Sequence, residues 1–125
     1  MTHSIICDRT FEFSVRILKL CERVSSRGAA ARYIASQLMR SSLSIGANAE
    51  EAQEGQTKAD FIAKMSISSK ESRESRWWLR ILVAAEIVKA QEVTWEQDEI
   101  GQIGKMIRSA ILTARSSPRR GSSRG

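Results

Sequence analysis

Proline is nearly absent from this sequence, because Pro118, close to the C-terminus, is the only one among 125 residues. A proline inside a helix would kink or break it, so the preceding residues are free to form long helices. The chain is also rich in Ala, Glu, Lys, Leu, Arg and Ser, and its length is that of one domain with a single core. We therefore predict one all-α domain.

Metal-binding residue types are equally scarce, with one histidine, His3, and two cysteines, Cys7 and Cys21. A di-iron bundle needs two Glu-x-x-His motifs, and zinc and haem sites lack ligands here for the same reason. We therefore expect no metal and no cofactor. The cysteines are predicted to be free thiols in a reducing compartment, with a disulfide or a metal pair as the alternative.

Catalytic motifs are also missing. There is no glycine-rich phosphate loop, and no Ser–Lys pair marks a serine nucleophile that could act without histidine. We expect the protein not to be an enzyme and to have no small-molecule substrate.

Long apolar runs are absent too. None approaches the roughly 20 residues of a membrane helix, and the N-terminal stretch MTHSIICDRTFEFS has no basic region followed by a long apolar one. The sequence therefore predicts no membrane partner and no signal peptide. We expect a cytoplasmic protein.

Acidic residues do not occur after Glu99, whereas six of the 20 basic residues do. The preceding part carries 14 residues of each sign, so the net charge of +6 lies entirely in the last predicted helix and the tail. Such a patch attracts polyanions or an acidic partner, and a solubilising tail is the alternative. The six residues are Lys105, Arg108, Arg115, Arg119, Arg120 and Arg124.

Four amphipathic segments separated by short breaks predict four helices. They run from Arg9 to Ser26, from Ala29 to Glu54, from Lys58 to Ala90 and from just after Thr94 to Ala114. Asp8 or Thr10 is the expected cap of the first helix and Thr57 that of the third. Short connections favour antiparallel neighbours, so we predict an up-down four-helix bundle over residues 9–114. Residues 1–8 would be an N-terminal extension and residues 115–125 a disordered basic tail.

Apolar residues cover more than half of the first predicted helix, in two neighbouring stripes. One stripe is Phe11, Val15 and Leu18, and the other is Phe13, Ile17, Leu20, Cys21 and Val24. No helix is central in a four-helix bundle, so the extra stripe predicts a homo-oligomer. The alternative is that it covers a neighbouring loop.

Small residues occupy the buried face of the second helix in the stretch QLMRSSLSIGANAEEA, from Gln37 to Ala52. The facing seam of the third helix carries Ser68, Ser72 and Ser75. Small residues on both sides let two backbones approach closely, and flanking charges are expected to pair. We predict a polar core network that sets the register of this hairpin, formed by Arg40, Ser44, Asn48, Glu51, Glu71 and Glu74.

Basic residues recur beside a tryptophan on the third helix. Guanidinium groups contact phosphates and an exposed indole stacks on an unpaired base, so this ridge predicts nucleic-acid binding, above all of RNA. The alternative is that Trp77 packs at a subunit interface while the arginines pair with Glu74 or with acids of a neighbour; we expect Trp78 to be the core tryptophan. The predicted nucleic-acid-binding residues are Lys70, Arg73, Arg76, Trp77 and Arg80 on the ridge, with Arg108, Arg115, Arg119, Arg120 and Arg124.

The same two stretches carry a family resemblance. QLMRSSLSIGANAEEA and KADFIAKMSISSKESRESRWWLRIL, from Lys58 to Leu82, resemble the pattern of the 23S rRNA-intervening sequence proteins, also called four-helix bundle proteins. The likeness extends over about residues 10–113, with Met65, Ser68 and Ser69 departing from the usual pattern. The basic tail is not part of the pattern.

That resemblance implies a four-helix bundle that assembles into a ring-like homopentamer, with no assigned catalytic residues. A more distant branch resembles accessory variability proteins of diversity-generating retroelements, which bind nucleic acid and a reverse transcriptase. It implies two hypotheses for function: a nucleic-acid-binding oligomer, and a protein-interaction scaffold that binds a partner such as a reverse transcriptase.

Overall fold

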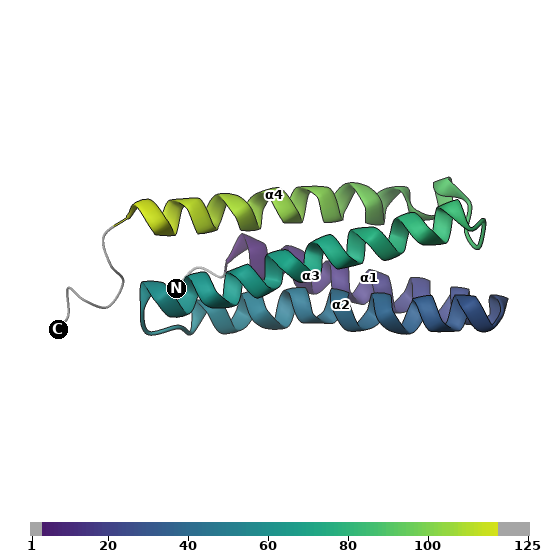
Figure 1. The fold of residues 1–125 in the computed structure, drawn as a ribbon, viewed down its shortest axis with the longest axis horizontal. Helices are drawn as coiled ribbons and strands as arrows, with labels where there is room; N and C mark the ends of the chain where they lie inside the picture. The colour runs from purple at the N-terminus through teal and green to yellow at the C-terminus, as the bar shows by residue number, and fades with distance from the viewer. Residues whose placement is uncertain (1–3, 118–125) are drawn as a thin grey trace.

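Four long antiparallel helices form the molecule, which a computed structural model describes over residues 4–117 (Figure 1). The helices are α1 (Ile5–Val24), α2 (Ala29–Gln53), α3 (Lys58–Ala84) and α4 (Thr94–Ser116), and a 3₁₀ turn precedes α2 and another precedes α4. Each helix packs against the next in sequence, and α1 closes the bundle against α4. The described part contains no strand, so the predicted all-α up-down bundle is confirmed.

Helix α1 begins four residues earlier than predicted. Ser4 caps it, because its hydroxyl accepts a hydrogen bond from the backbone N–H of Cys7 at 3.3 Å. The prediction of Asp8 or Thr10 as the cap was wrong: Asp8 lies in the first turn, and the hydroxyl of Thr10 donates to the carbonyl of Cys7. Serine and aspartate are about equally favoured at the N-cap position, so residue type alone did not distinguish Ser4 from Asp8 as the cap. Residues 5–8 thus belong to the bundle.

Helix α3 ends at Ala84, well before the predicted Ala90. The chain turns at Glu86, whose φ of 61° is left-handed. The N–H of Ile87 donates to the carbonyl of Leu82 at 3.0 Å, and the N–H of Glu86 donates to that of Val83. This is the Schellman ending, in which the left-handed residue is usually glycine. Glutamate stands there instead, so the sequence carried no visible stop signal.

The far end of α4 meets the start of α3. The N-terminal cap predicted at Thr57 is confirmed by a 3.0 Å bond to the N–H of Asp60. The ammonium of Lys58 donates to the carbonyls of Arg115 and Ser117, each at 3.0 Å, and so neutralises the negative end of α4. Arg115 lies within α4, so the predicted tail does not begin at this residue. The predicted tail residues from 118 onward lie outside the described residues.

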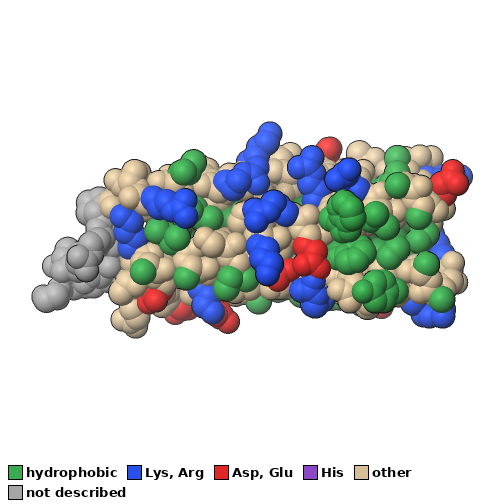
Figure 2. All heavy atoms as spheres, viewed as in Figure 1, with side chains coloured by type: hydrophobic (Ala, Val, Ile, Leu, Met, Phe, Trp, Pro, Cys, Tyr) green, Lys and Arg blue, Asp and Glu red, His purple; other side chains and the backbone are tan. Residues whose placement is uncertain are grey.

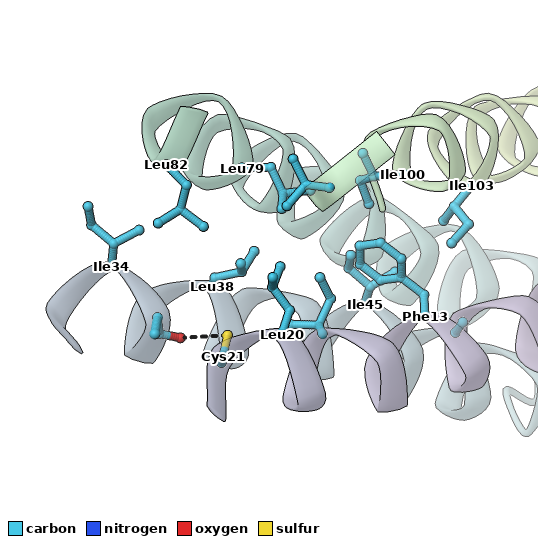
Figure 3. Close-up of a cluster of buried hydrophobic side chains, with 14 of the residues drawn as sticks. Phe13, Leu20, Cys21, Ile34, Leu38, Ile45, Leu79, Leu82, Ile100 and Ile103 are labelled. Carbon is cyan, nitrogen blue, oxygen red and sulfur yellow. Dashed lines mark hydrogen bonds between the residues drawn. The ribbon is translucent and has the colours of Figure 1, made fainter. Parts of the chain in front are cut away.

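One continuous apolar core runs along the bundle axis (Figure 3). The inner stripe of α1 is buried in it as the spacing predicts, and so are four isoleucines of α4, Ile100, Ile103, Ile107 and Ile111. Cys7 and Cys21 are free and buried, and the thiol of Cys21 lies 3.4 Å from the carbonyl oxygen of Ala35. Burial raises the pKa of Cys21 to about 12, so its reactive thiolate form is suppressed.

The α2–α3 seam is built from hydroxyls. Ser75 is fully buried, and its Oγ lies 2.8 Å from that of Ser41 and 3.0 Å from that of Ser42. Further along, Ser68 donates to the carbonyl of Ile45 on α2 at 2.8 Å. Hydroxyls therefore hydrogen-bond across the hairpin where leucines would separate the two backbones.

Helices α1 and α2 also approach each other closely where Gly46 faces Thr10. A β-carbon at position 46 would lie 3.3 Å from the hydroxyl of Thr10 and 3.6 Å from that of Ser14. The stretch from Gln37 to Ala52 thus uses small residues toward both of its neighbours.

Candidate nucleic-acid interface

The predicted polar network has one well-connected part, centred on Arg40 of α2. Its guanidinium contacts Glu71 at 3.4 Å and Glu74 at short range, and the indole N–H of Trp78 donates to Glu74 at 3.1 Å. Burial raises the pKa of Glu74, but the hydrogen bonds from Arg40 and Trp78 outweigh it, so the pKa lies below its ordinary value. Glu71 and Glu74 of α3 therefore both pair with Arg40 of α2, as is expected of groups that set the register of this hairpin.

The remaining members of that predicted network do not join it. Asn48 bonds to Ser44 one turn back on the same helix, at 2.9 Å to the carbonyl and 3.0 Å to the hydroxyl. Glu51 pairs with Lys64 of α3 at 2.8 Å on an open part of the surface. The structure thus shows three separate groups instead of one network, because these side chains lie on successive turns of α2.

The ridge of α3 is exposed. Arg73, Arg76 and Arg80 are all exposed, and Trp77 has 51% of its surface accessible. The guanidinium carbon of Arg80 lies 5.9 Å from the ring centre of Trp77, within the range of a cation–π contact. Trp78 is partly buried against the core and lies edge-on to Tyr33, so the two neighbouring tryptophans face different surroundings, as expected.

The arginines of this face have no ion-pair partner among the described residues. In residues 4–117, no carboxylate lies within ion-pair distance of Arg73, Arg76, Arg80, Arg108 or Arg115. By contrast, two arginines elsewhere are paired. Arg9 lies 2.7 Å from Glu99, and Arg27 lies 2.9 Å from Glu92. Glu74, the acid that the alternative interpretation paired with the ridge, is engaged elsewhere. Figure 2 shows the resulting band of basic side chains over α3 and α4.

Arginines from both helices meet at a groove between α3 and α4, with a volume of about 320 Å³. Sequence reasoning selected each of these arginines but did not bring them together, because only the antiparallel pairing places the middle of α3 beside the end of α4. The lining residues are Ser66, Ser69, Arg73, Arg108, Ile111, Leu112 and Arg115.

An apolar face lies on the opposite side of the bundle, over α1 and α2. Phe11 is 69% exposed, Val15 and Leu18 are each 38% exposed, and Leu43 of α2 is 42% exposed beside them. Together they line a second groove of about 310 Å³. No loop of the described chain covers this stripe, so the alternative that it packs under a loop was wrong.

Among residues 4–117, no group of three or more His, Cys, Asp or Glu side chains is arranged to hold a metal ion. None of the helices in this part of the chain has the length and apolar character needed to cross a membrane. The predicted site residues Arg119, Arg120 and Arg124 lie outside the described residues.

The fold and surface together define a small helical-bundle protein with one basic and one apolar face. The chain belongs to the family of 23S rRNA-intervening sequence proteins, whose model matches residues 2–109. A crystal structure from the S23 ribosomal protein family of Bacteroides thetaiotaomicron, described as a protein of unknown function, is 32% identical. It superimposes with a TM-score of 0.79, over 86% of this chain and 98% of that one. A comparison with curated proteins found no match.

Proposed function

We propose that this protein is a non-enzymatic homo-oligomer that binds RNA through the face formed by α3 and α4. The observation that supports the proposal is the set of exposed arginines on that face that have no carboxylate partner in the described chain. RNA carries a regular array of phosphates, and arginine binds phosphate through paired, charge-assisted hydrogen bonds. The exposed Trp77 adds a surface on which an unpaired base can stack.

Self-association is the second part of the proposal, and its surface is the apolar α1–α2 face. The occupant we propose is a second copy of the chain. The exposed surface of α1 beside the stripe carries both signs of charge, at Glu12, Arg16, Lys19 and Glu22, so it is suited to meet a copy of itself. The family resemblance implies a ring of five. Repetition of the RNA-binding face around a ring would turn weak contacts into avidity.

The RNA-binding part is tested with two matched triple variants in a salt series. The first replaces Arg73, Arg76 and Arg80 with glutamine. The control replaces Arg23, Arg32 and Lys89 with glutamine. These residues are exposed near the α1–α2 and α3–α4 connections, and their replacement removes the same charge. The logarithm of the binding constant falls linearly with the logarithm of the salt concentration. We expect this decline to be shallower by about 2 in slope for the ridge variant, since each single-strand phosphate contact contributes roughly 0.7. Equal losses in both variants would show that net charge alone drives binding, and would refute the assignment to this face.

The oligomer is tested by sedimentation of a variant in which Phe11 and Leu18 are replaced by serine. We expect smaller particles with unchanged helicity by circular dichroism. The matched control is Ile67→Ser, because Ile67 is 40% exposed on α3 and lies away from the apolar face. An unchanged mass for the double variant would reject this face as the interface.

A protein-interaction scaffold is the second candidate, favoured by the same apolar groove. An amphipathic helix of a partner, such as a reverse transcriptase, could lie in a groove of this kind. The sedimentation experiment separates the two candidates. A wild-type monomer that binds no RNA would leave the groove open to a partner and favour the scaffold.

A further inference from the structure

The groove between α3 and α4 combines three cationic side chains with hydroxyls. Arg73 enters from α3, and Arg108 and Arg115 enter from α4. Its volume of about 320 Å³ is near the lower end of the range for ligand sites, roughly 300–1,000 Å³, and would hold about ten waters. A phosphate group with part of its sugar is therefore of suitable size.

The three guanidinium groups of this groove have no carboxylate partner in the part of the chain that the structure describes. One guanidinium nitrogen of Arg73 donates to Ser69 at 3.1 Å, which holds that side chain at the groove wall. Each guanidinium has five N–H donors, so most donors here remain available. Three like charges brought together from two helices repel one another, and a bound anion would remove that repulsion. The chain has no acid after Glu99 that could do so from α4.

Gly104 gives a second, independent reason to single out this groove. A β-carbon there would lie 3.1 Å from a terminal nitrogen of Arg108, and 3.7 Å from the hydroxyl of Ser72. The guanidinium of Arg108 therefore lies back over the bare backbone of α4, next to α3. Glycine inside a helix costs about 0.5–1 kcal/mol relative to alanine. At Gly101, by contrast, a β-carbon would meet nothing within 4 Å, so only the later glycine makes room for a charged group.

The apolar residues at the groove favour a nucleotide over a bare inorganic ion. Ile111 is buried, whereas Leu112 is 64% exposed, and together they give the groove an apolar wall suited to a sugar or base. Trp77 lies one turn of α3 beyond Arg73, about 6 Å along the helix axis. A strand leaving the groove in that direction would pass an indole on which an unpaired base can stack.

We propose that this groove is a phosphate-binding site, in which Arg73, Arg108 and Arg115 hold one backbone phosphate of single-stranded RNA. The inference rests on the proposed RNA-binding function and names the contact point of the strand. Gly104 sets the position of Arg108 and is a positioning residue.

The test uses two pairs of variants of the full chain and a labelled oligouridylate of about 12 nucleotides. Arg108→Gln is matched by Lys105→Gln, which removes the same charge from an exposed position of the same helix that does not line the groove. We expect at least about 10-fold weaker binding for Arg108→Gln, as for loss of one charge-assisted hydrogen-bonding group, and less than about 2-fold for Lys105→Gln.

The second pair changes no charge. Gly104→Ala should shift the tip of Arg108 by a few tenths of an ångström and weaken binding measurably, whereas Gly101→Ala should leave binding unchanged. Both alanines raise helix propensity by similar amounts, so a general effect on α4 would appear in both variants. Circular dichroism and sedimentation of each variant check that fold and assembly are retained.

Each outcome bears on the inference. Equal losses for Arg108→Gln and Lys105→Gln would overturn the groove as the phosphate site and leave the RNA-binding function standing. Absence of RNA binding by the wild type at physiological salt would overturn both. If inorganic pyrophosphate raised the melting temperature through Arg108 and displaced the oligouridylate at similar concentration, the ligand would be a small anion and the assignment to RNA would be wrong.

Discussion

Replacing Ser75 with alanine should destabilise the α2–α3 seam more than removing all three hydroxyls of its cluster. Ser75, Ser41 and Ser42 are each fully buried. Ser41 also donates to the carbonyl of Leu38 at 3.3 Å, whereas the hydroxyl of Ser42 has only that of Ser75 as a partner among the described hydrogen bonds. The single replacement therefore leaves the hydroxyl of Ser42 buried without its partner.

The magnitude follows from that asymmetry. A buried hydroxyl left without a partner costs about 1–3 kcal/mol, and rotation of Ser42 toward the carbonyl one turn back would recover part of it. We expect Ser75→Ala to lower the free energy of unfolding by about 2 kcal/mol. The triple alanine variant loses these bonds and also the one from Ser41 to the carbonyl of Leu38, but it leaves no buried hydroxyl without a partner, and alanine has the higher helix propensity at each position. Its free energy of unfolding should lie within about 1 kcal/mol of the wild type.

Urea denaturation followed by circular dichroism measures both values. All variants must be compared at one protein concentration, because association would shift apparent stability by mass action. Ser109→Ala, at an exposed serine of α4, is the control and should change stability by less than about 0.5 kcal/mol. A triple variant less stable than Ser75→Ala would refute the reasoning, since it would mean that the hydroxyl cluster is itself strongly stabilising.

Three further predictions concern the chain connections and use the same assay. Glu86→Gly should stabilise the protein by about 1 kcal/mol, because the φ of 61° at this position strains a side-chain-bearing residue; no gain would refute that strain. Gly28→Ala should cost about 1–3 kcal/mol through the backbone alone, since φ is 128° and a β-carbon would meet nothing within 4 Å; a neutral result would contradict this. The hydrogen bond from Arg27, and then that from the backbone at position 89, lowers the pKa of Glu92 from 4.5 to about 2. Its stabilisation is therefore present above about pH 4.5 and lost as the pH falls toward 2, and Glu92→Gln should flatten the stability profile over that window; an unchanged profile would reject the link.

The helix ends show why boundaries are harder to predict than helices. The cap at Thr57 was identified correctly, because threonine favours the N-cap position and stands directly before the predicted helix. The end of α3 was not, because Glu86 adopts a conformation that glycine normally supplies. That residue is held by bonds around the helix end and by the packing of Ile87 against the core, which composition does not reveal.

The candidate site, like the helix ends, was predicted only in part. The sequence predicted the exposed ridge residues, because three- and four-residue spacing places Arg73, Trp77 and Arg80 on one side of a helix. It did not predict the groove with Arg108 and Arg115, since those residues are more than thirty positions away and their distance from α3 depends on the register of the helix pair.

By itself, then, the sequence determined the number of helices, their inward faces and the balance of charge along the chain, all of which depend on local periodicity and residue type. The tertiary structure decided which small residues hydrogen-bond across the α2–α3 seam, which arginines have no carboxylate partner among residues 4–117, and which of those arginines line one groove. These features arise where helices distant in sequence are packed side by side, and the physical reason is that antiparallel register is set by the fit of the whole core and not by any one segment.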